Sequence, residues 1–540
     1  MWQQNYTPIA GSLALSAALA SLPILALLFT LGVRRIAAWK AALTGLGLAT
    51  LVALLVYRVP VLTTASAIAY GAAFGLFPIC WIVYWAIVLY RISLESGKFE
   101  IIKDSIGSLT RDPHLQALLI AFALGAFIEG ACGFGTPVAV AAAMLTGLGF
   151  TPFYAACICL VANTAPVAFG SLGLPLVTLA GVTGLELRKL SSDVGRICAP
   201  ISVIIPSYLV KIMGGWGALR RVLPATLVCG ISFATAQFLA SNFIGPYLTD
   251  IIASIAAITA LIILFRIWKP SDLAGAASAG SPEKRMEFSV TEILVAWSPY
   301  GLLVVLVLVW GLSSVKGRLD SATFIFNWPY LHNLVLRVPP VVSGVSPYGA
   351  KYTLNSLSIS GTACMIAALG SSLVLKLPFS QTMHIIASTM RQLFHTFVTI
   401  AGVVAMAFLM NYSGATVTLA LALAATGSVF PFFSPLLGWL GVFLSGSDTA
   451  SNALFGNLQV VTANQLGVNP VLMAAANSSG GVMGKMISLQ SIAVAAAATG
   501  MQSSDEGKLF RFTLKHSVLL VALIGLITLF YTYVTPSWVR

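Results

Sequence analysis

The chain has 540 residues, of which 58% are hydrophobic and only 8% are charged, whereas soluble domains carry about 25% charged residues. Apolar runs of about 20 residues, long enough to cross a bilayer, recur along the sequence and exclude a large soluble domain. The net charge of +13 does not indicate a nucleic-acid partner, because the basic residues lie in short connections between apolar runs. The composition predicts a polytopic protein in contact with the lipid bilayer.

The first three apolar runs, Leu13–Val33, Ala41–Tyr57 and Ile68–Leu89, each predict one membrane span. Basic residues gather after the first and third runs, where Arg34, Arg35 and Lys40 and then Arg91, Lys98, Lys103 and Arg111 occur, whereas only Arg58 follows the second. Because cytoplasmic loops collect Lys and Arg, we expect the N-terminus outside. We interpret Ser93–Leu115 as a cytoplasmic connection with an interfacial helix.

The next apolar stretch, Leu115–Phe150, is interrupted at Gly130–Pro137 by "GACGFGTP". This stretch holds too much glycine and proline for one continuous helix. Irregular backbone at membrane depth is tolerated only where protein covers it. We therefore predict a re-entrant hairpin over about 115–150, in which the glycines allow positive φ and close backbone approach.

Further spans are predicted near Phe153–Leu176, Ile201–Met213, Val222–Phe243 and Ile244–Trp268, before a basic cytoplasmic linker over 267–288. Against the positive-inside bias, Arg188, Lys189 and Arg196 fall in a loop that this orientation places outside. The second half begins near Glu292 and includes spans near Leu393–Tyr412 and Val518–Val534. Its "SGSDTASN" segment predicts a second hairpin over about 431–466.

The two halves correspond weakly in sequence. When Phe443–Gly446 is set against Phe127–Gly130, "VANTAPVAFG" (161–170) meets "AANSSGGVMG" (475–484). The third span runs inward, whereas its counterpart near Leu393–Tyr412 runs outward. We predict an all-α polytopic protein with about 12 transmembrane helices and two re-entrant hairpins in two inverted-topology repeats, 1–213 and 289–540, joined by 214–288. Such repeats are typical of secondary transporters, and both termini are expected outside.

Two acidic residues stand alone in long apolar stretches: Glu129 and Asp448. A carboxylate at the centre of a bilayer costs about 2.5–3.5 kcal/mol on insertion scales, so we expect a function for both. Burial favours the uncharged form of a carboxyl group, and either residue could carry a coupled proton. Asp448 is preferred because hydroxyl and amide groups surround it. One alternative is that the acid is permanently ionised in a salt bridge. The other is that the two breaks are ordinary short loops at the membrane surface.

Lys485 is the only Lys or Arg between Gln392 and Gly507. A buried ammonium needs a partner, which Asp448 or an anionic substrate could supply; the alternative is a lysine that snorkels to the interface. Predicted breaks at Asn163–Pro166 and Asn477–Gly480 would leave helix N-termini that attract anions. The remaining substrate-binding candidates are small polar residues or glycines, each of which could instead pack helices: Gly133, Gly135, Thr136, Asn163, Thr164, Ser445, Ser447, Thr449, Asn452, Asn477 and Ser478.

Five stretches resemble the bacterial lactate permease family, whose members also include glycolate permeases: "FIEGACGFGTPVAVAAAMLTGLGF" (127–150), "NTAPVAFGSLGLP" (163–175), "SNFIGP" (241–246), "FFSPLLGWLGVFLSGSDTASNALFGNLQ" (432–459) and "GKMISLQSIA" (484–493). The resemblance covers nearly the whole chain. It implies proton-coupled uptake of L-lactate, D-lactate or glycolate, which are small 2-hydroxy monocarboxylates, across the bacterial inner membrane. It implies the proton as coupling ion, with no cofactor and no metal. Cys132, Thr136 and Leu489 depart from the family pattern, which leaves the substrate preference open.

Other function classes fit less well. A sodium-coupled di- or tricarboxylate carrier would share this architecture, but a doubly charged substrate would require more than one buried cation. An enzyme would need clustered catalytic groups, whereas the five histidines are scattered and no HExxH or GxSxG motif occurs. His384 and His395 are expected at the surface. A channel, the oligomeric state, and an elevator or rocking motion remain open.

Overall fold

The computed structural model describes residues 1–539 apart from residues 33, 35, 108, 111, 134, 269–287, 503 and 504. Within these described residues, 11 helices are long and apolar enough to cross a membrane, or up to 12 if the bent pair Pro152–Ala162 and Val167–Thr183 is one span. The predicted all-α polytopic fold is therefore confirmed. The predictions that rest on Arg35, Arg111 and most of the linker 267–288 lie outside the described residues.

The helices of the first half follow the predicted spans, with shorter helical pieces between them. The third predicted span is longer than expected, because α3 and α4 form one run that bends at Phe77 (φ −139°). In chain order the elements are α1 (Leu13–Gly32), α2 (Ala38–Leu51), η1 (Val52–Val56), α3 (Val61–Phe74), η2 (Gly75–Cys80), α4 (Trp81–Glu95), α5 (Lys98–Gly107), α6 (Pro113–Ala117), η3 (Leu118–Leu124), α7 (Gly125–Ala131), α8 (Thr136–Gly147), α9 (Pro152–Ala162), η4 (Val167–Phe169), α10 (Gly170–Thr183), α11 (Leu187–Leu239), η5 (Ala240–Ile244), η6 (Pro246–Leu248) and α12 (Thr249–Ile267).

Helix α11 corrects the prediction for the region after Gly184. It begins at Leu187, so the basic residues expected in an outer loop lie in its first turns. Arg196 is held there by an ion pair with Asp193 (3.2 Å). The two spans predicted within 201–243 form one path, interrupted at Gly215 (φ 69°) and Val222 (φ −112°).

The second half is also helical, with a few short strands before α15. Its helices are α13 (Val290–Gly311), α14 (Ser313–Asp320), α15 (Ser360–Val374), α16 (Phe379–Ser413), α17 (Ala415–Ala424), η7 (Gly427–Val429), α18 (Phe430–Ser445), α19 (Asp448–Leu466), α20 (Pro470–Lys485), α21 (Leu489–Ala498), α22 (Glu506–Tyr533) and η9 (Pro536–Trp538). The strands are β1 (Trp2–Gln3), β2 (Phe324–Asn327), β3 (Val335–Arg337), β4 (Ser346–Pro347) and β5 (Lys351–Leu354).

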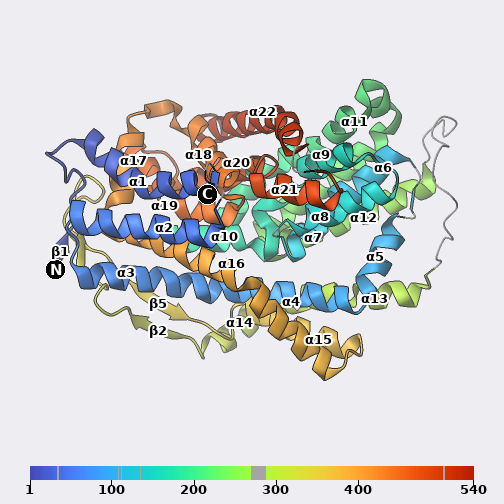
Figure 1. Ribbon diagram of the computed structural model, residues 1–540, viewed down its shortest axis with the longest axis horizontal. Coiled ribbons are helices and arrows are strands. Elements are labelled where there is room, and N and C mark those ends of the chain that lie inside the picture. Colours follow the sequence, from blue (N-terminus) through green and yellow to red (C-terminus); the bar gives the residue numbers. More distant parts are fainter. Residues whose placement is uncertain are drawn as a thin grey trace.

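The strands, which the sequence analysis did not predict, tie the N-terminus to the segment between α14 and α15. Strand β1 pairs in parallel with β3, β3 pairs antiparallel with β4, and β2 pairs antiparallel with β5. Beside β1, the Gln4 side-chain amide donates to the carbonyl oxygens of Asn411 (3.0 Å) and Tyr412 (2.9 Å) at the end of α16. Two distant parts of the chain are thereby fixed together at one end of the molecule (Figure 1).

The helices are interrupted at both places where the sequence predicts a break. Helices α7 and α8 are joined across residues 132–135, and α18 and α19 are joined across Gly446 and Ser447. The apolar window of Pro113–Ala131 is 94% buried, against 28% for Val290–Gly311, so the first hairpin limb is enclosed by protein. The two re-entrant hairpins, the inverted relation of the halves and the boundaries at 213 and 288 stay predictions.

The burial pattern separates an inner from an outer set of helices. Residues of α7, α10, α19 and α20 are mostly buried, and these helices lie in the interior of the molecule in Figure 1. Large apolar side chains such as Leu25, Leu55, Ile263 and Leu294 are exposed on other helices. Such outward-facing apolar side chains suit contact with lipid acyl chains.

Candidate functional site

A cavity of about 460 Å³ lies between Glu129 near the end of α7, the start of α10, the break between α18 and α19, and α16. This volume falls in the range of small-molecule sites, about 300–1,000 Å³. Six of the predicted site residues line it: Glu129, Ser445, Ser447, Asp448, Thr449 and Lys485. The break regions of both halves therefore contribute to one cavity, which the sequence could suggest only through the weak correspondence between them.

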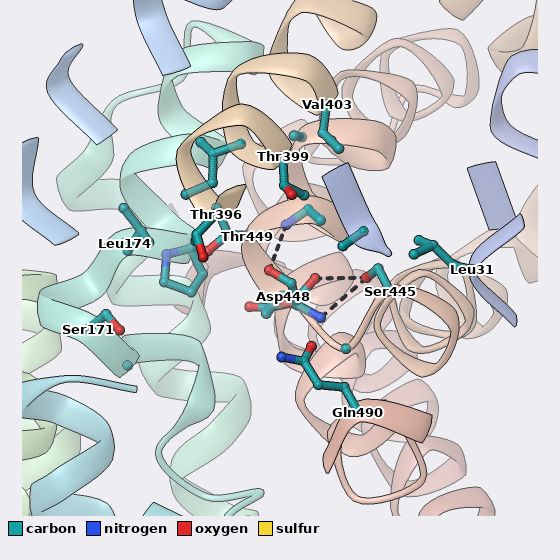
Figure 2. A pocket seen from close by; sticks show the side chains of 18 of the residues that line it. Leu31, Ser171, Leu174, Thr396, Thr399, Val403, Ser445, Asp448, Thr449 and Gln490 are labelled. Carbon is teal, nitrogen blue, oxygen red and sulfur yellow. Dashed lines mark hydrogen bonds between the residues drawn. The ribbon is translucent and has the colours of Figure 1, made fainter. Parts of the chain in front are cut away.

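The break between α18 and α19 positions the first group of polar residues. Gly446 takes a left-handed conformation (φ 72°) that ends α18, and the Ser447 hydroxyl accepts from the Ala450 amide as the N-cap of α19. Asp448 is consequently the first residue of α19. The Ser445 hydroxyl turns back to donate to the Gly441 carbonyl (2.6 Å). Figure 2 shows Ser445, Asp448 and Thr449 together at this end of the cavity.

Asp448 is buried and is held by hydrogen bonds on one oxygen only. The Ser478 hydroxyl donates to Oδ2 at 2.6 Å, and the Asn452 amide donates to the same oxygen at 3.4 Å. Behind them, the Asn477 amide donates to Asn452 Oδ1 (2.9 Å) and the Gln459 amide to Asn477 Oδ1 (3.1 Å). The other oxygen, Oδ1, has no hydrogen-bond partner among the described residues. Hydrogen bonds therefore fix one carboxylate oxygen of Asp448 and leave the other without a partner among the described residues.

Three candidates predicted to contact substrate belong to this network instead of the cavity lining. Asn452, Asn477 and Ser478 are fully buried behind Asp448. The predicted break at Asn477–Gly480 is wrong, because α20 is a continuous helix from Pro470 to Lys485. Its glycines serve packing: a Cβ on Gly480 would lie 2.0 Å from the Pro435 carbonyl oxygen, and one on Gly484 would lie 2.4 Å from that of Trp439. Small residues of this kind allow close helix contact in membranes.

Lys485 ends α20 and is 8% exposed. Its ammonium donates to the Gly446 carbonyl oxygen at 2.9 Å, so its direct partner is backbone in the second break and not the predicted Asp448 carboxylate. Among the described residues it forms no ion pair within 4.0 Å. A buried ammonium with one carbonyl partner retains donors for an anion.

Glu129 lies in the last turn of α7, at the start of the other break. Gly170 makes room for it, since a Cβ there would lie 2.6 Å from Oε1. Gly133 and Gly135 have the expected positive φ, 58° and 81°, and the Ser171 hydroxyl donates to the Cys132 carbonyl at 2.9 Å. Glu129 Oε2 is buried without a hydrogen-bond partner among the described residues.

The chain beside Glu129 is strained where α9 breaks into α10. Ser171, Leu172 and Gly173 have φ of 47°, 57° and 71°, a left-handed turn that costs non-glycine residues of order 1–3 kcal/mol each. Two predicted candidates, Asn163 and Thr164, are buried at the end of α9. The structure does not place them, or Gly133, Gly135 and Thr136, in the cavity lining.

The cavity also contains polar residues that sequence reasoning missed. Ser171, Thr396, Thr399 and Gln490 line it, and Figure 2 shows Thr399 and Gln490 on opposite sides of Asp448. His395, expected at the surface, is exposed but lines the cavity too, with its ring centroid 5.4 Å from that of Trp39. Gln490, five positions after Lys485 in "GKMISLQS", was the one that the motif could have indicated.

Comparison with known proteins gives a consistent result over the whole chain. The family model described as L-lactate permease matches residues 16–535. The chain is 45% identical to an L-lactate permease of Salmonella typhimurium and to the glycolate permease GlcA of Escherichia coli, and 44% identical to an L-lactate permease of Bacillus subtilis. Each match covers 99% of this chain and 98–99% of the relative. The fold is also similar to the YdaH transporter of Alcanivorax borkumensis, with 16% identity, coverage of 86% and 87%, and a TM-score of 0.45.

Proposed function

The chain belongs to the L-lactate permease family, and we propose that it is a secondary active transporter that couples uptake of L-lactate, D-lactate or glycolate to protons. The names of its relatives, L-lactate permease and glycolate permease, support the substrate class and favour a transporter over an enzyme. The relatives are bacterial, and we assign the protein to the inner membrane with both termini outside.

The observation that carries this proposal is the presence of a buried ammonium and two buried carboxyl groups in the lining of one small cavity. The Lys485 ammonium keeps donors free for a carboxylate, which is common to lactate and glycolate. Thr449 and Gln490 line the same cavity and offer hydroxyl and amide groups to the adjacent substrate hydroxyl. A site that hydrogen-bonds a hydroxyl group discriminates against analogues that lack it.

Proton coupling follows from the charge at Asp448. An ionised Asp448 repels a substrate carboxylate in the same low-dielectric cavity, whereas a protonated one does not. Asp448 lines the cavity, and Ser478 holds its Oδ2 in place in both protonation states. Substrate therefore binds best to the protonated carrier, and by linkage bound substrate strengthens proton binding.

The proposal is tested with the purified protein in liposomes. Uptake of labelled L-lactate, D-lactate and glycolate is measured under a pH gradient alone and under a Na⁺ gradient alone. We expect accumulation when the outside is acidic, abolition by a protonophore and no dependence on Na⁺. Accumulation that requires Na⁺ and ignores the pH gradient would contradict proton coupling and favour the sodium-coupled di- or tricarboxylate carrier, which labelled succinate and citrate would then identify.

A further inference from the structure

A third acid, Asp250, lies outside both breaks and packs against the end of α7, next to Glu129. Asp250 is in the first turn of α12 and is 1% exposed. The contact is close, because a Cβ on Gly130, the residue after Glu129, would lie 2.7 Å from Asp250 Cβ and 3.2 Å from the Ile251 backbone nitrogen. Only glycine in the hairpin lets α12 approach the break at this distance.

Among the described residues, the carboxyl group of Asp250 has no hydrogen-bond partner to offset its burial. Neither of its oxygens has a hydrogen-bond partner among the described residues, and both are buried. Glu129, the neighbour of the Gly130 that Asp250 contacts, likewise has a buried Oε2 without a partner among the described residues. Two carboxylates that are both dry and near each other cannot both be ionised, so the pair retains a proton.

The other elements packed against α12 bring few groups that could replace that proton. η3 and α10 have no titratable residue, and η6 has only Tyr247. From α11 the Cys198 thiol interacts with Asp250, and the same helix carries the Asp193–Arg196 ion pair. On the cavity side of Glu129 the interacting cation is Lys485. A proton is therefore the ligand that this pair is suited to bind.

We propose that Asp250 and Glu129 form a second proton site, which loads and releases a coupled proton in addition to the one carried by Asp448. The inference rests on the proposed function. Glu129 lines the cavity and Asp250 lies behind it, so a substrate anion adds negative charge beside the pair and favours its protonated form. The step is protonation of one carboxylate on loading and its deprotonation on release, with no other bond changed.

The number of coupled protons distinguishes this inference from the proposed function. In proteoliposomes with the membrane potential clamped at zero and a pH gradient of about one unit, each coupled proton raises the limiting lactate accumulation about tenfold. Wild-type protein is therefore expected to accumulate lactate about 100-fold, and Asp250→Asn about tenfold, with lactate counterflow retained. Asp320→Asn, which removes an exposed acid at the end of α14, is the matched control and should equal wild type.

Charge movement provides a second transport readout. A lactate anion carried with two protons moves one net positive charge, so lactate addition should generate a current in wild type and none in Asp250→Asn. Wild-type accumulation of only about tenfold, or an Asp250→Asn variant equal to wild type, would overturn the second site while leaving the proposed function intact. Absence of any pH-driven accumulation in wild type would overturn the proposed function itself.

A chemical readout on the wild-type protein does not depend on transport or on the folding of a variant. Dicyclohexylcarbodiimide modifies protonated carboxyl groups in apolar surroundings, and mass spectrometry of the labelled peptides locates the modified residue. We expect labelling at Asp250 or Glu129 near neutral pH, decreasing as the pH rises. If neither residue reacts while the protein remains folded by size-exclusion chromatography, the pair does not hold a proton and the inference is wrong.

Discussion

The two break regions hold their acids in different surroundings. Asp448 is fixed on Oδ2 by Ser478 and Asn452, within a chain of buried amide and hydroxyl groups. Glu129 lies in the space made by Gly170, with the Asn163 side chain and the cation Lys485 near it and a second acid, Asp250, behind it. A hydrogen-bonded carboxyl group keeps its geometry whether protonated or not, whereas an unpartnered pair responds mainly to charge. Under the proposed function, Asp448 and Glu129 are therefore two different kinds of proton site.

Substitution of Lys485 should have the largest effect on uptake. Its ammonium is tied to the second break by a hydrogen bond to the Gly446 carbonyl oxygen. Lys485→Ala removes the cation available to the substrate carboxylate, and loss of a buried charge partner costs about 2–5 kcal/mol. The KM for lactate uptake should therefore rise by at least about 30-fold. Lys485→Arg is the control and should retain part of the affinity; an unchanged KM in the alanine variant would exclude this role.

The next effect concerns Asp448. Asp448→Asn keeps the shape of the side chain and its place beside Ser478 but removes the titrating group. The limiting accumulation of lactate should fall about tenfold for each unit of imposed pH gradient, while counterflow continues. Glu129→Gln is the matched change in the other break. If Asp448→Asn kept full pH-dependent accumulation, Asp448 would not be a proton carrier.

A matched pair of glycine variants compares the two surroundings directly. In Gly481→Ala the new methyl group would lie 2.3 Å from Asp448 Oδ1, and in Gly170→Ala it would lie 2.6 Å from Glu129 Oε1. Overpacking of this kind costs about 1–3 kcal/mol. Because Asp448 loses its hydrogen bonds when displaced and Glu129 has none at Oε2 to lose, Gly481→Ala should lower the thermal stability and uptake rate more. Equal losses would show that the Asp448 network has no special importance.

The smallest effect should follow from Ser171→Ala in the first break. It removes one hydrogen bond, from Ser171 Oγ to the Cys132 carbonyl (2.9 Å), which contributes about 1 kcal/mol. A small decrease in the unfolding temperature and a change in uptake rate of less than about tenfold are expected. Ser478→Ala, which unpairs Asp448 Oδ2, is the comparison in the second break and should cost more in both measurements.

Much of this arrangement could be predicted from the sequence, because lone acids and clustered glycines are conspicuous in apolar stretches. Glu129, Asp448 and Lys485 were identified in this way and line one cavity. The glycines of 480–484 were misread as a helix break because composition does not distinguish glycine that interrupts a helix from glycine that lets two helices touch. Asp250 was not predicted, because it lies outside the two stretches with a single acid, 113–185 and 321–504, although its own sequence "IGPYLTDIIASIAA" is apolar.

Contacts between distant segments were beyond sequence reasoning. Thr396 and Thr399 enter the cavity from α16, which crosses the molecule in Figure 1, and nothing in their local sequence marks them. The pairing of β1 with β3 joins residues more than 300 positions apart. Such contacts depend on the packing of whole helices, which local propensity does not specify.

The backbone contact between α18 and α20 has a mechanical consequence. A Cβ on Gly438 would lie 1.8 Å from the Asn477 carbonyl oxygen, and Gly480 and Gly484 meet α18 as closely, so no layer of side chains remains there to act as a sliding surface. We therefore expect the end of α18, which leads into Asp448, and the end of α20, which carries Lys485, to move together as one rigid unit. If the proposed transport exposes the cavity to alternate sides, we expect the two moving parts to meet elsewhere, where α16 lines the cavity.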